Sequence, residues 1–227
     1  MKRLFLCAAL FFSMVTTALA SDYFVYSQYD TGMWGSYGVT GFVGKDGVDR
    51  IVYYTNDWSG GAVAHVVRVN IPDGQNANAH PANPDATGPI AQRTFTPELT
   101  FPLGVTPGHE SEFLVSDQGA TIYLGASVGI RKYVYNESLG TYIYAGNMAP
   151  AAPIDEWYGT QSLAYDPSTD TWYAGAISWN NFPGQTQRKM WKYEAGQGAN
   201  GVWELAFTYT TEQPGSHHDG MEMVNGN

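Results

Sequence analysis

Residues 109–127 read HESEFLVSDQGATIYLGAS and are followed at 130–146 by IRKYVYNESLGTYIYAG. Residues 160–178 repeat this pattern as TQSLAYDPSTDTWYAGAIS, followed at 188–209 by RKMWKYEAGQGANGVWELAFTY. Each copy contains a short apolar run, a turn, a second run that ends in small residues, and then an aromatic strand. Repeats of about 40–50 residues made only of strands are typical of propeller blades. The repeat therefore predicts an all-β fold, a β-propeller-like stack of four-stranded antiparallel blades.

The same repeat of strands and turns extends over most of the chain. The two copies predict blades at about 108–149 and 157–213, and a further copy opens at 217–227 with HHDGMEMVNGN. A first blade is expected at about 36–101, because alternating apolar and polar residues separated by Gly or Asp-Gly turns indicate hairpins. Its expected strands are VTGFVG (39–44), RIVYYTN (50–56), AVAHVVRVNI (62–71) and IAQRTFTPELTF (90–101).

The number of blades is small for a propeller. Closed propellers have about four to eight blades, whereas this sequence supplies three, a leading strand at Tyr23–Tyr29 and the start of another blade. We therefore expect the propeller to be incomplete in this chain. The alternative is that three sheets stack without closing into a ring.

The N-terminus has the organisation of a bacterial-type signal peptide. Lys2 and Arg3 precede an apolar run at 4–15, and residues 18–20 (ALA) form a small-x-small cleavage site. Cleavage is expected after Ala20, which leaves a single mature domain over 21–227. The alternative is an uncleaved membrane anchor, but the apolar run is short for a hydrocarbon core of ~30 Å. We therefore expect a secreted or periplasmic protein with no transmembrane segment in its mature chain.

Composition excludes several classes of function. Removing residues 1–20 takes away two of the 11 basic residues and none of the 21 acidic ones, so the mature chain carries a net charge of −12. An acidic surface repels phosphate backbones, which excludes nucleic acid as a favoured partner. Cys7 lies within the signal peptide and is the one cysteine of the sequence, so disulfides, thiol catalysis and Cys-ligated zinc are excluded as well.

Histidines and carboxylates at the start of two blades are candidates for a divalent metal site. Imidazole nitrogens and carboxylate oxygens are the usual zinc ligands in the absence of cysteine. Neighbours on a strand point to opposite faces, however, so His217 and His218 cannot both face one ion in an extended segment. The alternative is a polar turn at the entrance to each blade. The candidate ligands are His109, Glu110, His217, His218, Asp219 and Glu222.

Two oxygen-rich segments are candidates for calcium. The segment DPSTDTW (166–172) lacks the glycine and the distal bidentate Glu of an EF-hand loop, and a hairpin turn also accounts for its residues. The long segment at 72–89 (PDGQNANAHPANPDATGP) offers carboxylates and amides at close spacing, with a solvated loop held by Asx-turns as the alternative. The candidate calcium ligands are Asp73, Asn76, Asn78, Asp85, Asp166 and Asp170.

Aromatic residues make up 15% of the chain and serve either packing or binding. Large flat side chains fill the space between twisted sheets, which accounts for most of them. Exposed Trp and Tyr also stack on sugar rings or form protein interfaces. Trp58, Trp157 and Trp179 adjoin predicted loops and are the candidates for a ligand surface.

The blade cadence, as in SLAYDPSTDTWYAG (162–175) and HHDGMEMVNGN (217–227), resembles that of secreted bacterial propellers of the NHL, YVTN and gluconolactonase-like kind. The resemblance covers about 36–227 and concerns architecture. It implies lactonases, lyases and binding scaffolds as relatives. The metal-dependent lactonases among such propellers carry Glu, Asn and Asp ligands at the tunnel mouth. That set does not map onto particular residues of this chain, so no catalytic residue is assigned from it.

The sequence contains no G-x-S-x-G, H-E-x-x-H, Walker or dinucleotide-binding motif. Few titratable residues and many aromatics favour an exported, non-catalytic propeller-type binding or interaction module for a glycan, a protein or an envelope partner. The alternative is a metal-dependent, lactonase-like hydrolase or lyase whose calcium or zinc ion is held at the axial mouth by His109, Glu110, His217, His218 or Glu222.

Overall fold

The computed structural model describes residues 36–55, 62–70, 94–105, 107, 113–153, 162–175 and 187–210. Almost all of them belong to one compact unit, Asp30–Val69 with Phe95–Asn227. The second unit, Met1–Tyr29 with Asn70–Thr94, contributes Asn70 and Thr94 to the described residues. The predicted signal peptide, the leading strand at Tyr23–Tyr29 and the blade start at 217–227 lie outside them.

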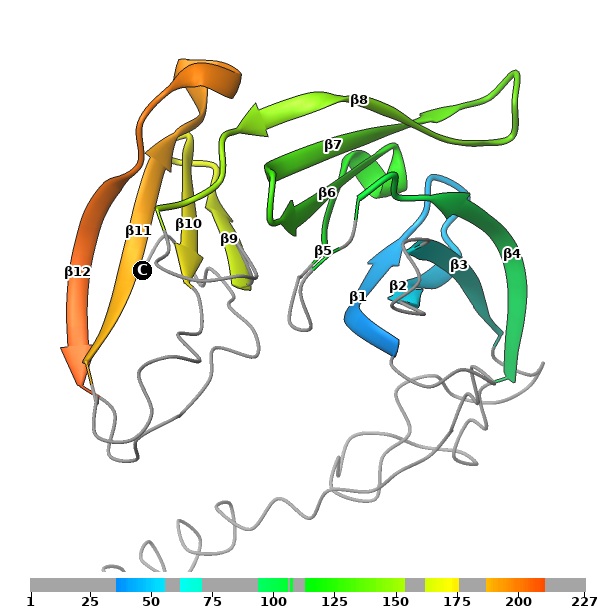
Figure 1. The fold of residues 1–227 in the computed structure, drawn as a ribbon. Coiled ribbons are helices and arrows are strands. Elements are labelled where there is room, and N and C mark those ends of the chain that lie inside the picture. The colour runs from blue at the N-terminus through cyan, green and yellow to red at the C-terminus, as the bar shows by residue number, and fades with distance from the viewer. Residues whose placement is uncertain are drawn as a thin grey trace, which may run out of the picture. The chain divides into compact units, whose positions relative to one another are not determined.

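The described part of the chain is all-β and forms three four-stranded antiparallel sheets (Figure 1). In each sheet the strands follow one another in chain order, so each sheet is a simple meander, as in a propeller blade. This confirms the predicted fold class, and each sheet covers about the range that the repeat predicts for one blade.

The bounds of the elements are as follows. Sheet 1 contains β1 (Ser36–Val43), β2 (Asp49–Thr55), β3 (Val63–Asn70) and β4 (Thr94–Pro102). Sheet 2 contains β5 (Phe113–Ser116), β6 (Thr121–Ala126), β7 (Gly129–Asn136) and β8 (Thr141–Ala149). Sheet 3 contains β9 (Ser162–Asp166), β10 (Thr171–Gly175), β11 (Gln187–Glu194) and β12 (Glu204–Thr210). Two short 3-10 segments, η1 (Asp117–Gly119) and η3 (Ala195–Asn200), interrupt the connections.

Burial differs between the inner and the last strands of the sheets. In β6 and β10 nearly every residue is buried, on both faces of the strand. In β4, by contrast, most residues are exposed, and β12 exposes Leu205 and Phe207. A strand buried on both faces needs a neighbouring layer on each side, so the sheets must pack face to face.

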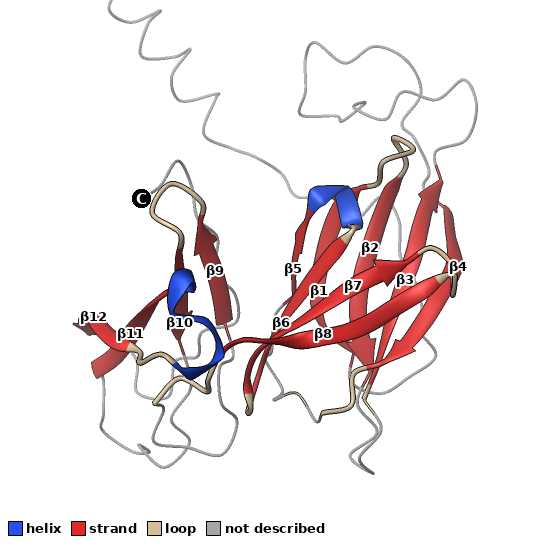
Figure 2. Ribbon diagram, turned by 90° about the horizontal axis from the view of Figure 1, so that it is seen from above, coloured by secondary structure: helices blue, strands red, loops and turns tan. Residues whose placement is uncertain are grey.

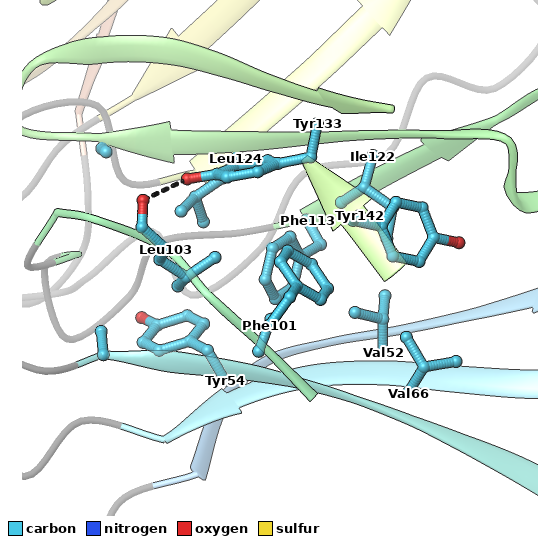
Figure 3. Packing of buried hydrophobic residues seen from close by; sticks show 13 residues of the cluster. Val52, Tyr54, Val66, Phe101, Leu103, Phe113, Ile122, Leu124, Tyr133 and Tyr142 are labelled. Atoms are coloured by element: carbon cyan, nitrogen blue, oxygen red, sulfur yellow. Dashed lines mark hydrogen bonds between the residues drawn. The ribbon is translucent and has the colours of Figure 1, made fainter. Parts of the chain in front are cut away.

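Sheets 1 and 2 share one hydrophobic cluster. Phe101 of β4 packs between the sheets, with ring centroids 5.0 Å from Tyr142 and 5.5 Å from Tyr133 (Figure 3). Tyr54 of sheet 1 meets Phe113 of sheet 2 edge to face at 5.8 Å. The other buried members of this cluster include Val52, Val66, Leu103, Ile122 and Leu124.

Sheets 2 and 3 share a second cluster. It contains Ile130 and Ala149 from sheet 2, and Leu163, Trp172 and Tyr193 from sheet 3. Sheet 2 therefore packs on both of its neighbours and is common to both clusters.

The first strands of successive sheets are also neighbours. Strand β5 contacts both β1 and β9, and its contact with β1 is visible in Figure 2. The hydroxyl of Thr40 on β1 donates a hydrogen bond to the carbonyl of Phe113 on β5 at 2.7 Å. Sequential sheets thus meet through their first strands as well as through their faces.

Candidate functional site

A pocket of about 290 Å³ lies between sheets 1 and 2, at the end where their hairpin turns gather. Its volume is close to the lower limit of about 300 Å³ for small-molecule sites. The walls come from the β1–β2 turn at 44–46, the β5–β6 turn at 118–120, and β4 at Glu98 and Leu99. Three carboxylates, an arginine and a lysine lie beside aromatic and aliphatic side chains, so the pocket has both polar and apolar walls.

Arg50 forms the charged wall. Its Nη1 and Nη2 donate to the two carboxylate oxygens of Asp46 at 2.7 and 2.8 Å, and its Nε and Nη2 donate to Glu98 at 2.6 and 3.3 Å. The remaining Nη1 hydrogen points to the carbonyl of Val48 at 3.3 Å. A guanidinium has five N–H donors, so Arg50 has no donor left for a ligand.

Glu98 is shared by two arginines. Arg68 on β3 donates from its Nε to Glu98 Oε1 at 2.7 Å. We call Asp46, Arg50, Arg68 and Glu98 the Arg50 network. It contains two positive and two negative groups, so its charges compensate one another within the protein.

Contacts within the network shift the pKa values of Asp46, Arg50 and Glu98 away from neutrality. The hydrogen bond from Arg50 holds the pKa of the Asp46 carboxyl well below its usual range, and the bond to Asp46 raises the pKa of Arg50. Burial alone would raise the pKa of Glu98, but the hydrogen bonds from Arg50 and Arg68 outweigh it and lower that pKa. These carboxylates are therefore charged and fully engaged at neutral pH.

The apolar wall fixes the β5–β6 turn. The Tyr142 hydroxyl donates to the carbonyl of Gly119, and burial raises the pKa of Tyr142 to about 12. The ring of Phe42 lies directly on Gly119, where a Cβ would come within 2.4 Å of it. The Tyr135 ring meets that of Tyr142 edge to face at 5.3 Å. These contacts leave the turn little freedom to move.

Four side chains at the pocket remain available to a ligand. Lys45, Gln118, Glu137 and Tyr135 are exposed. None of the four forms a side-chain hydrogen bond or ion pair within the parts of the chain that the structure describes. They are the groups that the pocket can offer to a bound molecule.

The predicted calcium ligands Asp166 and Asp170 lie in the β9–β10 turn of sheet 3. Asp166 Oδ1 accepts hydrogen bonds from the backbone N–H and the hydroxyl of Ser168 at 2.8 and 2.7 Å, and its Oδ2 accepts one from Thr169 at 2.7 Å. Asp170 Oδ1 accepts the Tyr165 hydroxyl at 2.6 Å. Both carboxylates thus accept hydrogen bonds within the hairpin turn, as the alternative to calcium binding predicts. The hydrogen bonds from Ser168 and Thr169 lower the pKa of Asp166. Calcium binding here stays a prediction.

The other candidate residues lie outside the described residues, so their predicted roles stay predictions. They are the metal candidates His109, Glu110, His217, His218, Asp219 and Glu222, the loop candidates Asp73, Asn76, Asn78 and Asp85, and the aromatic candidates Trp58, Trp157 and Trp179. Within the described ranges no three His, Asp or Glu side chains gather into a metal-binding group. In the same ranges no helix has the length and apolar character to cross a bilayer.

Sequence reasoning missed the Arg50 network and the pocket. The segment GKDGVD (44–49) separates two expected strands, as a turn does, but Asp46 in it and Arg50 directly after it carry a second signal. Charged residues are only 14% of this chain, so an Asp and an Arg on either side of a Gly turn are a local concentration. Glu98 could not be added to them from the sequence, because it reaches them through sheet pairing.

No protein-family model matches this chain, and no curated protein matches it either. The geometry of the pocket is therefore the basis on which a function can be inferred.

Proposed function

We propose that this chain is an exported, non-catalytic binding module of the β-propeller type. We further propose that the pocket between sheets 1 and 2 receives a small polar group of its extracellular partner. The observation that carries the proposal is the pocket itself, whose charged wall is compensated internally and whose four exposed side chains form no hydrogen bond or ion pair within the described residues.

The direction of the pKa shifts favours binding over acid–base chemistry. A general acid or base near neutral pH requires a carboxyl pKa that is raised or a cationic pKa that is lowered. At this pocket the pKa values of Asp46 and Glu98 are lowered and that of Arg50 is raised. Each shift moves the group further from the range in which it could exchange a proton.

The rigidity of the pocket also supports a binding role. Arg50 is held by two carboxylates, and Gly119 is held by Phe42 and Tyr142. A pocket whose walls are already in place loses little conformational entropy when a ligand enters. This is the property expected of a recognition site.

The test is a protein-observed NMR titration of the ¹⁵N-labelled chain with a collection of small polar molecules. We expect saturable shifts that cluster on the amides of Lys45, Gln118 and Gly119. Tyr135→Ala should weaken the response about tenfold, since an exposed aromatic contact is worth roughly 1 kcal/mol or more. Phe207→Ala on β12 is the matched control, because this exposed aromatic lies outside the pocket. Saturable binding that leaves the pocket amides unmoved would contradict the proposal.

A further inference from the structure

The β5–β6 turn has an unusual backbone. Asp117, Gln118 and Gly119 are consecutive and all have positive φ, at 53°, 56° and 88°. The left-handed region costs a non-glycine residue free energy, because its Cβ approaches the following carbonyl. Two non-glycine residues in succession therefore make this a strained turn.

The connection itself does not require this strain. In sheet 3 the β9–β10 turn occupies the same position and has the same length, four residues between the paired Asp166 and Thr171. Only its last residue, Asp170, has positive φ. The β7–β8 turn also has four residues, and there only Gly140 has positive φ. Among these three turns, the β5–β6 turn alone has two consecutive non-glycine residues with positive φ.

The surrounding structure holds the strained turn in place. Tyr142 donates to the Gly119 carbonyl, and the Phe42 ring covers Gly119. The Asp117 carboxylate accepts hydrogen bonds from Ser116 at 3.2 Å and Thr121 at 3.5 Å. Strained backbone that its surroundings enforce is found preferentially at functional sites.

The consequence of this conformation is the position of Gln118. Its side chain lines the pocket and forms no hydrogen bond with the described part of the protein. The charges of the Arg50 network neutralise one another, and the two other charged groups at the pocket, Lys45 and Glu137, have opposite signs, so an ionic ligand would meet a like charge as well as a countercharge. A primary amide, in contrast, both donates and accepts hydrogen bonds. This combination suits a ligand with neutral hydroxyl groups.

From the strained turn and the compensated pocket, we propose that Gln118 is the ligand-contacting residue and that the ligand is a neutral sugar unit. The Gln118 amide would bridge neighbouring hydroxyls, and the Tyr135 ring, 38% exposed, would cover an apolar face of the sugar ring. This inference rests on the proposed function, because it names the ligand class of the same pocket.

The test uses methyl glycosides of glucose, galactose, mannose and N-acetylglucosamine as neutral probes, with glucuronate and inorganic phosphate as charged probes. Each is titrated at millimolar concentration into the labelled protein. We expect at least one neutral glycoside to shift the Gln118 and Gly119 amides, and the two charged probes to leave them unmoved.

The decisive variant is Gln118→Gly, because glycine adopts the left-handed conformation without steric cost. We expect it to bind the glycoside at least tenfold more weakly, while its Tm stays at the wild-type value or rises by up to about 4 °C. Loss of binding without loss of stability separates ligand contact from a structural role. Ser168→Gly, in the corresponding turn of sheet 3, is the matched control and should bind as the wild type does.

The other outcomes are equally clear. Unchanged affinity in Gln118→Gly would overturn the role of Gln118. A charged probe that shifts the pocket amides when no glycoside does would overturn the sugar inference but leave the proposed function standing. Glycosides that shift only amides remote from the pocket would overturn both.

Discussion

At the scale of single residues, Arg50 determines the charged wall of the pocket. It belongs to a network of four side chains on four segments, the β1–β2 turn, β2, β3 and β4, and bonds directly to Asp46 and Glu98. Its own side chain is 15% exposed, whereas that of Asp46 is 48% exposed. Removing the Arg50 guanidinium therefore leaves Asp46 in water, whereas the Glu98 side chain, 21% exposed, keeps Arg68 as its partner.

Arg50→Met should destabilise the protein by about 1–3 kcal/mol at neutral pH, because hydrogen bonds to charged groups are lost. The pH dependence should change as well. The pKa values of Asp46 and Glu98 are lower in the folded state, so their contribution is present above their unfolded pKa values of about 4 and is lost as pH falls below them. Urea denaturation at about pH 7 and about pH 3 should therefore show that the free energy of unfolding falls less on acidification in Arg50→Met than in the wild type.

Lys192→Met is the control for this prediction. Lys192 pairs with Glu204 at 3.2 Å, but both side chains are exposed. An exposed pair contributes about 0–1 kcal/mol. If the free energy of unfolding fell equally between neutral and acid pH in the wild type and in Arg50→Met, the network would not be the cause of the pH dependence.

Gly119→Ala tests the other wall of the pocket. The new methyl group would lie 2.4 Å from Phe42 Cε2, and the residue has a φ of +88°. We expect a loss of about 2–4 kcal/mol from backbone strain and overpacking together. Gly140→Ala has a φ of +64° but open space around it, so it should lose only about 1–2 kcal/mol. Chemical denaturation gives the loss in the free energy of unfolding for each variant, and the difference between the two losses measures the clash with Phe42. Equal losses would contradict the close contact between Phe42 and Gly119.

At the scale of elements, β7 and the end of β4 are joined by one buried hydrogen bond. The Tyr133 hydroxyl on β7 donates to the carbonyl of Leu103, the residue after β4, at 2.7 Å (Figure 3). Both residues are almost fully buried, and burial raises the pKa of Tyr133 to about 12. The bond therefore connects sheets 1 and 2 where no water can replace it.

Tyr133→Phe should cost about 1–2 kcal/mol, because the Leu103 carbonyl would stay buried without its donor. The aromatic contact with Phe101 is kept in this variant, so the change isolates the hydroxyl. Tyr135→Phe, two residues along the same strand and exposed, should change stability by less than about 0.5 kcal/mol. Thermal or urea denaturation of both variants provides the comparison. A Tyr133→Phe variant as stable as Tyr135→Phe would contradict the stabilising role of the bond to Leu103.

At the scale of the whole molecule, the sequence predicted the sheets well and the pocket not at all, and both results have a physical cause. Alternation and turn chemistry are local, so SLAYD (162–166) and TWYAG (171–175) identify β9 and β10 directly. The pocket joins the turn at 44–46 to the turn at 118–120, and those segments meet only because sheets 1 and 2 pack together. The left-handed conformation of Asp117 and Gln118 was not predictable either, since Asp adopts it in only some turns and Gln has no preference for it.

The shared position of sheet 2 leads to a prediction about cooperativity. Leu124 on β6 is fully buried in the cluster with sheet 1, while Ile130 and Ala149 of the same sheet are buried in the cluster with sheet 3. In a stack in which each sheet contacts only its neighbours, loosening the middle sheet should remove the support of both outer ones. Leu124→Ala should thus cost about 2–5 kcal/mol.

The loss of stability in Leu124→Ala should also appear in sheet 3, although Leu124 does not belong to the cluster that sheets 2 and 3 share. Native-state hydrogen exchange is the measurement, because it gives the free energy of opening for each strand separately. We expect the amides of β10 to lose as much protection as those of β6 in Leu124→Ala. Leu139→Ala, at a turn residue that is 66% exposed, should leave both strands unchanged. If β10 instead kept its wild-type protection while β6 lost its own, sheet 3 would be stable without sheet 2. Each sheet pair would then fold independently, and the repeat would define separate units in place of one cooperative stack.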